Sequence, residues 1–411
     1  MSRARSLITR WPLVALLLLS LLMLPLLDGC RSSGQATPTS TKTPKTTATA
    51  EADTATPRPP TATPTPAVTP TPRPSVTPTS MRPTATPTPV PPTPHLTVVP
   101  APTLAENLCP LTGLPVDDPA KLARRPLAVK ISNSLPTRPQ SGLAKADIVF
   151  EHLAEGGITR FTALYLCQDA ELIGSMRSAR FIDLEIPAMY KSMLVFSGVS
   201  PGLVPKFKDA DFRERQLSPD PLWNDPGTYR VPQEDRLYEH TLFTDTKLLW
   251  QVTAERGLNQ RQQLDGLAFG AEPPDGGKDA SKVDIPYRLS PVRYEYDAAL
   301  GGWRRWIADQ PHVEASTGTQ HAPANVVIVG AHHVETDIIE DSLGSRSIQI
   351  QLWGDGPAMA LRDGKAYEIR WMRSDSHDML HFVYHDGTPF PLRPGQTWIQ
   401  LVPLDMETPV Q

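Results

Sequence analysis

Residues 31–104 consist largely of repeated Thr-Pro units, such as TPTP, TPRP and PPTP, and contain almost no large apolar side chains. A segment of this composition cannot bury enough apolar surface to offset the entropy lost on ordering, so we expect it to be disordered and locally similar to polyproline II. Fully extended at about 3.1 Å per residue, it could reach about 200 Å. Any folded core must therefore come from the residues that follow, about 105–411.

The N-terminus has the organisation of a secretory signal. Several arginines among the first ten residues precede an apolar run at 11–27, which ends in the sequence Leu-Asp-Gly-Cys at 27–30. This ending resembles the lipobox of bacterial lipoproteins, in which the cysteine receives a diacylglycerol and, after cleavage, a further acyl chain such as palmitate. Asp28 departs from the small residue that the pattern prefers. We predict a signal peptide at 1–29 and a lipidated Cys30, and the alternative is an uncleaved signal anchor.

Either version places the rest of the chain outside the cytoplasm, anchored to the cytoplasmic membrane. Residues 30–104 would then be the lipidated cysteine followed by a spacer that holds a folded part away from the lipid. The formal net charge of −4 argues against nucleic acid as a partner. The membrane, reached through the lipid anchor, is the partner that the sequence predicts directly.

Composition divides the folded part in two. Residues 105–269 alternate apolar runs typical of strands with helical patterns, which predicts an α/β domain with a central sheet and flanking helices. Residues 270–281 (GAEPPDGGKDAS) are rich in glycine and proline and form the predicted linker. Residues 282–411 contain short, turn-separated runs, which predicts a mostly antiparallel β domain.

Two cysteines, Cys109 and Cys167, remain after lipidation. In an oxidising compartment they most simply form a disulfide, and the alternative is a pair of buried thiols. A metal site would need more ligands nearby. His381 and His385, on a predicted strand, would lie too far apart to share an ion, so we predict no metal site.

Six stretches of the chain carry a resemblance to a known family. They are CPLTGLPVDDPAKLARRPLAVKISN (109–133), RPQSGLAKADIVFEHLAEGGITRF (138–161), IGSMRSAR (173–180), HTLFTDT (240–246), TGTQHAPANVVIV (317–329) and PGQTWIQLVP (394–403). In these stretches the chain resembles the YerB-like lipoproteins, whose two adjoining domains have no assigned function. The resemblance implies a membrane-anchored envelope protein with an α/β domain followed by a β-rich domain. It brings no reaction, cofactor or catalytic residue.

The stretch IGSMRSAR places Arg177 and Arg180 three positions apart, separated by two small residues. Arg160 lies at the start of a predicted strand, 159–166. If that strand pairs with the run at 171–176, three guanidinium groups converge at one end of the sheet. The planar guanidinium binds phosphate or carboxylate with two parallel hydrogen bonds and keeps its proton. The three arginines are therefore candidate ligands for an anion.

Ser178 and two nearby acids complete this candidate site. We expect Ser178 to begin a helix whose free N–H groups face the same anion. Glu151 and Glu155 could hold a divalent ion or act as a base beside a bound phosphate. The alternative is structural: the arginines form ion pairs with Glu151, Glu155 and other local acids, because burying unpaired cations costs several kcal/mol each.

The sequence leaves three functions open. The first is an envelope lipoprotein that binds an anionic wall polymer or a lipid-linked phosphate. The second is a phosphoglycan transferase or hydrolase, because the pattern of strand starts and arginines is similar to that of the LytR-CpsA-Psr transferases. The third is a non-catalytic scaffold. No cofactor is predicted beyond the divalent ion that the second function would need.

A serine motif offers one further catalytic candidate. Residues 198–202 (GVSPG) match the G-x-S-x-G pattern of a nucleophile elbow, with His240 or His312 as the nearest candidate bases. A serine followed by proline is equally typical of a helix start, where the hydroxyl caps free N–H groups. We therefore predict a helix cap at Ser200 in preference to a nucleophile.

Overall fold

The apolar runs predicted as strands form the centre of one large sheet. The computed structural model describes residues 99–411; the predicted signal peptide, Cys30 and most of the linker at 30–104 lie outside the described residues. Strands β1 (Leu127–Ser132) and β3 (Thr159–Tyr165) are buried along their whole length. Strands covered on both faces read as nearly continuous apolar runs, and this explains their sequences.

Twelve of the described strands make up this mixed sheet. Ten lie along one path, in the order β10 (Lys278–Asp279), β18 (Lys365–Arg373), β17 (Gly354–Arg362), β15 (Asn325–Ile339), β21 (Thr397–Pro403), β2 (Ile148–Leu153), β3, β1, β5 (Met193–Val195) and β6 (Gln216–Leu217). Two more strands pair at the side of this path: β16 (Arg346–Gln351) with β15, and β19 (His381–Val383) with β18.

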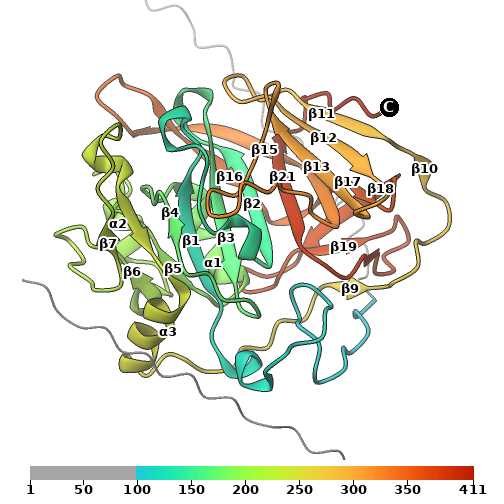
Figure 1. Ribbon diagram of the computed structural model, residues 1–411, viewed down its shortest axis with the longest axis horizontal. Coiled ribbons are helices and arrows are strands. Elements are labelled where there is room, and N and C mark those ends of the chain that lie inside the picture. Colours follow the sequence, from blue (N-terminus) through green and yellow to red (C-terminus); the bar gives the residue numbers. More distant parts are fainter. Residues whose placement is uncertain (1–98) are drawn as a thin grey trace, which may run out of the picture. The chain divides into compact units, whose positions relative to one another are not determined.

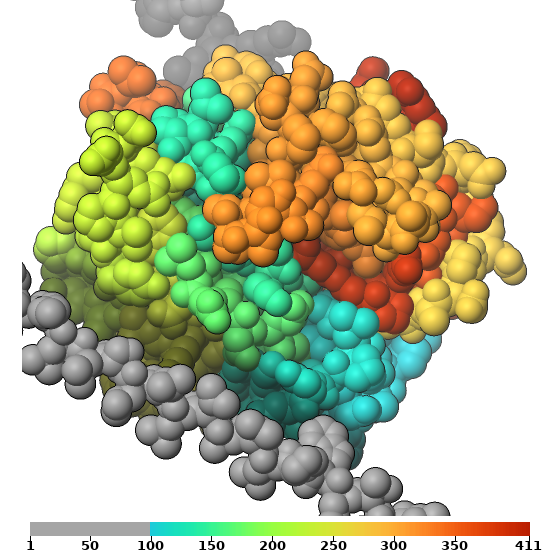
Figure 2. Space-filling model, in the orientation of Figure 1, coloured from blue at the N-terminus to red at the C-terminus, as the bar shows by residue number. Residues whose placement is uncertain are grey.

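The sheet passes through both halves of the folded chain. Strand β21 lies parallel to β2, with Phe150 opposite Ile399, and parallel to β15 on its other side. β2 precedes the predicted linker at 270–281 and β21 follows it. Figure 1 shows β21 beside β2, and Figure 2 shows orange and red C-terminal residues lying against teal and green ones. Residues 99–411 accordingly belong to one compact unit.

The remaining strands form three small sheets. An antiparallel sheet in the C-terminal half contains β11 (Lys282–Ile285), β12 (Val292–Asp297), β13 (Gly302–Ile307) and β14 (Gln310–Pro311). The other two contain β4 (Ile173–Gly174), β8 (Leu242–Thr244) and β7 (Tyr229–Arg230), and β9 (Ala268–Phe269) with β20 (Pro391–Leu392).

The described chain as a whole is rich in strands, and its helices are few and short. The N-terminal half contributes to a large central sheet, as predicted, but only short helical segments stand for the predicted flanking helices. The α-helices are α1 (Ile186–Met189), α2 (Val204–Lys208) and α3 (Thr246–Glu255). Lys191 adopts φ 49° directly after the cap of α1, a conformation that ends a right-handed helix. In the described residues no helix is long and apolar enough to cross a lipid bilayer.

The other helical segments are single 3₁₀ turns. They are η1 (Pro119–Ala123), η2 (Leu135–Thr137), η3 (Leu143–Lys145), η4 (Glu155–Gly157), η5 (Phe181–Leu184), η6 (Arg213–Arg215) and η7 (Tyr238–His240).

Successive residues of each central strand point to opposite faces of the large sheet. On one face Phe150 and Leu164 pack with Ile186 of α1. On the other face Val149 and Ala163 belong to a core that includes Tyr294 and Trp303 of the small antiparallel sheet. The two faces therefore have separate cores, and each core also encloses charged side chains.

Candidate anion-binding site

The segment with Arg177 and Arg180 reaches the arginine cluster by an unexpected route. The predicted pairing of residues 171–176 with 159–166 is wrong, because β1 and β2 already occupy both edges of β3. Instead β4 pairs with β8, and Met176 forms an isolated bridge with Ile131 of β1. The backbone N–H of Arg177 donates to the backbone carbonyl of Lys130, 3.0 Å away. Since Arg160 lies opposite Ser132 at the end of β1, all three arginines still reach one end of the sheet.

Glu155 binds two of the three guanidinium groups. Its carboxylate accepts hydrogen bonds from Arg160 Nη2 at 2.7 Å and from Arg180 Nε at 2.5 Å, and Arg180 Nη2 also donates to it. Arg160 is 5% exposed, Arg180 7% and Glu155 8%. These three side chains therefore form a nearly buried cluster in which one carboxylate accepts hydrogen bonds from two guanidinium groups.

Ser178 takes a different role from the predicted one. Its backbone carbonyl accepts a hydrogen bond from Arg160 Nη1 at 2.6 Å. The helical turn η5 begins at Phe181, and the Asp183 carboxylate accepts from the backbone N–H of Arg180 at 2.7 Å. The prediction that Ser178 begins a helix is wrong, because the turn begins at Phe181 and its N-cap residue is Arg180.

Glu151 lies on the opposite face of the sheet from the arginine cluster. Because side chains alternate along β2, His152 lies on the face of Arg160 whereas Glu151 faces β13. There Glu151 accepts from Arg305 Nη2 at 2.6 Å and from Thr159 Oγ1 at 2.8 Å. The structure thus brings Glu155 to the arginines and separates Glu151 from them.

A second charged cluster, missed by the sequence analysis, lies beneath the arginines. Lys130 Nζ is 2.7 Å from Asp183 Oδ2, 2.6 Å from His152 Nε2 and 3.0 Å from Thr162 Oγ1. All four side chains are fully buried. The available signal was a lysine inside the apolar run PLAVKIS, because a charge at a buried strand position needs a partner.

Burial and neighbouring charges fix the protonation states in this region. Burial lowers the pKa of Lys130 to about 8, against the opposing effect of Asp183. Burial, followed by the charge of Lys130, lowers the pKa of His152 to about 3, so this imidazole is neutral near pH 7.

Neighbouring charges and burial also shift the pKa values in the arginine cluster. Burial alone would raise the pKa of Glu155, but hydrogen bonds from Arg180 and the charges of both arginines lower it to about 2. Burial lowers the pKa of Arg160 to about 9, and the charges of Arg180 and Arg177 act in the same direction. A second carboxylate, Glu340 from the loop after β15, lies 3.4 Å from Arg180 Nε.

Arg177 differs from the other two arginines. Its side chain is partly exposed, and within residues 99–411 its guanidinium makes no salt bridge or side-chain hydrogen bond. Burial lowers its pKa, the charge of Glu239 opposes this, and the charge of Arg180 adds to it. Arg177 is therefore the guanidinium of this cluster that is available to an anion from solution.

Several cavities in the described part of the chain lie away from these arginines. One of about 830 Å³ is lined by residues that include Pro100–Glu106 and Arg261–Leu267. Any anion bound by Arg177 would thus sit near the surface and not in one of these cavities.

Ser200 has neither of its predicted roles. α2 begins at Val204 after Leu203, and the buried Oγ of Ser200 has no hydrogen-bond partner. The candidate base His312 is bonded to Arg305 and Gln140 instead. An unpaired hydroxyl is neither a cap nor an activated nucleophile.

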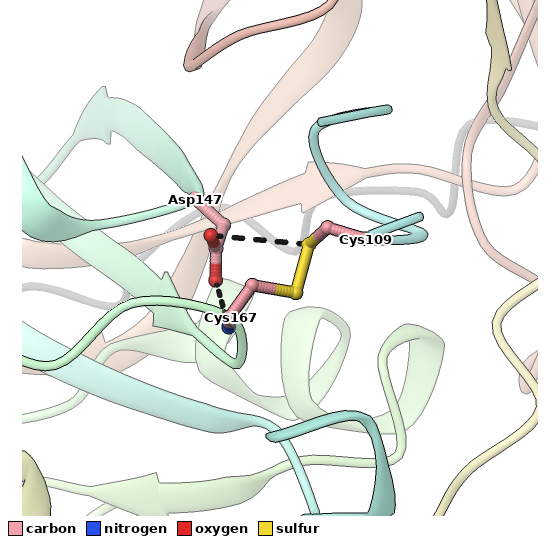
Figure 3. Close-up of side chains that lie close together, drawn as sticks. All are labelled: Cys109, Asp147 and Cys167. Atoms are coloured by element: carbon pink, nitrogen blue, oxygen red, sulfur yellow. Dashed lines mark hydrogen bonds between the residues drawn. A yellow bond between two sulfur atoms is a disulfide. The ribbon is translucent and has the colours of Figure 1, made fainter. Parts of the chain in front are cut away.

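Cys109 and Cys167 form a disulfide that ties the segment before β1 to the end of β3. Figure 3 shows Asp147 beside it; Asp147 Oδ2 accepts from the backbone N–H of Cys167 at 3.0 Å. Burial raises the pKa of Asp147 to about 6. The cysteine sulfurs and a carboxylate oxygen lie within 4.8 Å of one another, but the disulfide removes both thiolates as metal ligands.

The fold and sequence place the chain in a family of paired domains. Residues 111–259 match the family described as "Protein of unknown function (DUF3048) N-terminal domain", and residues 283–399 match the corresponding C-terminal domain. The chain belongs to this YerB-like family, as the sequence analysis predicted. The family's own description assigns it no activity.

A named relative and a solved structure agree with this assignment. The chain is 30% identical over 309 residues to "Putative lipoprotein YerB" of Bacillus subtilis, covering 74% of this chain and 88% of that protein. The crystal structure of the YerB protein from Bacillus subtilis aligns with a TM-score of 0.63 and 29% identity, covering 74% of this chain and 99% of the other.

Proposed function

We propose that this chain is an extracytoplasmic lipoprotein of the cell envelope, anchored to the cytoplasmic membrane through a lipidated Cys30. The N-terminal sequence supports this, with its basic start, its apolar run and a cysteine at the end of that run. The relative's name, which describes a lipoprotein, also supports it. The Thr-Pro segment would act as the spacer between lipid and folded part.

We further propose that the folded part binds an anionic, phosphate-bearing ligand of the wall or of a lipid carrier. The observation that carries this proposal is the partly exposed guanidinium of Arg177, which has no bonded partner within residues 99–411 and lies close enough to Arg160 to depress its pKa. A phosphate at Arg177 would accept two parallel hydrogen bonds from this guanidinium.

The same geometry gives no support to catalysis or to a metal. Glu155 is a poor base because its pKa is about 2, and Glu151 lies on the other face of the sheet. Both oxygens of Glu155 accept from arginines, so this carboxylate does not fit a divalent cation. We therefore propose a binding protein in preference to a phosphoglycan transferase, a hydrolase or a pure scaffold.

The anchor can be tested by changing Cys30→Ser. Acyl labelling should disappear, and the protein should no longer be processed as a lipoprotein. Labelling that persists in this variant would contradict the proposed anchor.

Ligand binding can be tested on the full-length protein in detergent. We expect inorganic pyrophosphate, or a polyprenyl phosphate in mixed micelles, to raise the melting temperature. Arg177→Ala should abolish the shift, whereas Arg213→Ala, at an exposed arginine on η6, should retain it. No shift at millimolar ligand, or a shift that survives Arg177→Ala, would contradict the proposed site. A response to polyprenyl phosphate alone would identify a lipid-linked ligand.

A further inference from the structure

The hairpin between β15 and β16 extends beyond the large sheet. β15 pairs with β17 and β21 only as far as Ala331, and from His332 to Ile339 its partner is β16 alone. Figure 1 shows this orange hairpin projecting to the upper left, on the side of the molecule where α2 lies.

The hairpin packs closely on the segment before α2. Ile338 lies against the core cluster that contains Phe196 and Phe207. At Gly202 an added Cβ would lie 2.6 Å from Ile338 Cγ2, so only glycine permits this approach. This contact explains the second glycine of the GVSPG motif, and it places the residue after β15 over the arginine cluster.

That residue is Glu340, and its carboxylate is unusual. The side chain is fully buried, yet neither oxygen has a hydrogen-bond partner. The nearest charge is Arg180 Nε at 3.4 Å, and this nitrogen donates to Glu155 instead. Because a buried carboxylate without hydrogen bonds is costly, the surrounding positive charge must offset that cost. Within residues 99–411 Glu340 thus forms only a long ion pair with Arg180 and accepts no hydrogen bond.

We propose that the Glu340 carboxylate occupies a subsite for one phosphate group of the anionic ligand, and that the ligand binds by displacing it. This inference rests on the proposed function and adds to Arg177 a second subsite, which lies beside Arg180. A tetrahedral phosphate offers more acceptor oxygens than one carboxylate, so it could accept bonds that Glu340 does not make. The subsite would suit a ligand with two linked acidic groups, such as a pyrophosphate.

The attachment of the hairpin permits this exchange. Its outer part is held by one strand pair and by side-chain packing, and its register is irregular between Glu335 and Ile339. Near its turn Leu343 is 90% exposed and Ile339 46% exposed, so these two side chains do not anchor the outer end of the hairpin. Moving Glu340 out would therefore leave the central strand pairs intact.

The test is a pyrophosphate titration of the full-length protein in detergent, comparing the native chain with Glu340→Gln. Glutamine keeps the size and removes the charge, so the competing group is lost and affinity should rise about tenfold. Asp337→Asn is the matched control, because it removes the same charge from an exposed position on the same hairpin. This control should bind like the native chain.

The outcomes separate the two proposals. If the native chain binds and Glu340→Gln binds no more tightly, displacement of Glu340 is wrong and the ligand site stands. If only Glu340→Gln binds, the subsite is real and the native chain does not have the proposed function. If neither binds at millimolar pyrophosphate, both proposals fail.

Amide hydrogen exchange provides a second, independent test of the displacement of Glu340. Saturating pyrophosphate should speed amide exchange in residues 332–351 of the native chain, because the hairpin loosens when Glu340 leaves. Unchanged or slower exchange there, in a chain that binds pyrophosphate, would overturn the displacement.

Discussion

Two buried ion-pair clusters lie on opposite faces of the central sheet, and they differ in how completely they are bonded. On one face every nitrogen of the Arg305 guanidinium has a partner, namely Tyr294, His312 and Glu151. On the other face Glu155 binds two arginines, while Arg177 has no bonded partner and the Glu340 carboxylate makes no hydrogen bond.

This difference separates a structural role from a candidate functional one. Arg305 links β13 to β2 through its bond to Glu151, so it holds the two halves of the chain together. In the other cluster Arg177 is partly exposed to solution. A buried polar group without a partner calls for an explanation, and a ligand is one that can be tested.

Removing the Arg305 guanidinium should have the largest effect on stability. Arg305→Ala leaves Glu151 as a fully buried carboxylate without its cation, and we expect a loss of about 5 kcal/mol in the free energy of unfolding. Urea denaturation measures this loss. Arg304→Ala, at the next and more exposed position of β13, should leave the unfolding midpoint nearly unchanged. Equal losses for both variants would contradict the structural role of the Arg305 cluster.

The disulfide should have the next largest effect, and it serves to separate stability from binding. Replacing both cysteines by alanine opens a loop of 58 residues, which corresponds to a loss of about 4 kcal/mol in the chain-entropy account. The affinity for pyrophosphate should stay the same under conditions where the variant is folded. A parallel loss of affinity would mean that the arginine cluster responds to general destabilisation.

Acid should weaken the arginine cluster through Glu155. Its folded-state pKa of about 2 lies below the ordinary 4.5, so its contribution is present above about pH 4.5 and is lost as the pH falls toward 2. At about 1.4 kcal/mol per pKa unit the contribution is about 3 kcal/mol. Urea denaturation at about pH 7 and about pH 3 should detect a loss of about 2 kcal/mol, because the rest is lost only as the pH falls toward and below about 2.

Glu155→Gln should remove this part of the acid sensitivity, whereas Glu368→Gln, in an exposed pair with Lys278, should not. An unchanged acid slope in Glu155→Gln would show that other carboxylates cause it.

The smallest effect on stability is expected at Arg177. Because its guanidinium makes no salt bridge or hydrogen bond within residues 99–411, Arg177→Ala should change the free energy of unfolding by less than about 0.5 kcal/mol. Arg160→Ala should cost more, because Arg160 is bonded to Glu155. A large loss of stability in Arg177→Ala would show that Arg177 has a structural role, as Arg305 does, and would weaken the case for a ligand.

The sequence predicted that Arg160, Arg177 and Arg180 gather, but through a strand pairing that does not form. Instead β4 pairs with β8, and the segment that follows reaches the end of β1 through Met176. The sequence was not sufficient to separate Glu151 from Glu155, although alternation along β2 already placed Glu151 and His152 on opposite faces. The 3₁₀ turn after β2 returns Glu155 to the arginine face; Gly156 and Gly157 indicate a turn there, but they do not indicate the face to which Glu155 points.

Partners that are distant in the chain could not be predicted. Arg305 reaches Glu151 across 154 residues, and Glu340 reaches the cluster only because the β15–β16 hairpin leaves the sheet. Such contacts follow from the tertiary arrangement of whole strands, which no periodicity in a single segment encodes. The placement of β21 between β2 and β15 also follows from the tertiary arrangement and could not be predicted from a single segment.

The position of β21 also has a consequence for how the protein matures. A strand made of residues 397–403 lies in the middle of the sheet, so β2 keeps one edge unpaired until these residues have been synthesised. An open edge of this kind is prone to aberrant pairing with other chains. Products truncated before residue 397 should consequently remain substrates for chaperones or proteases.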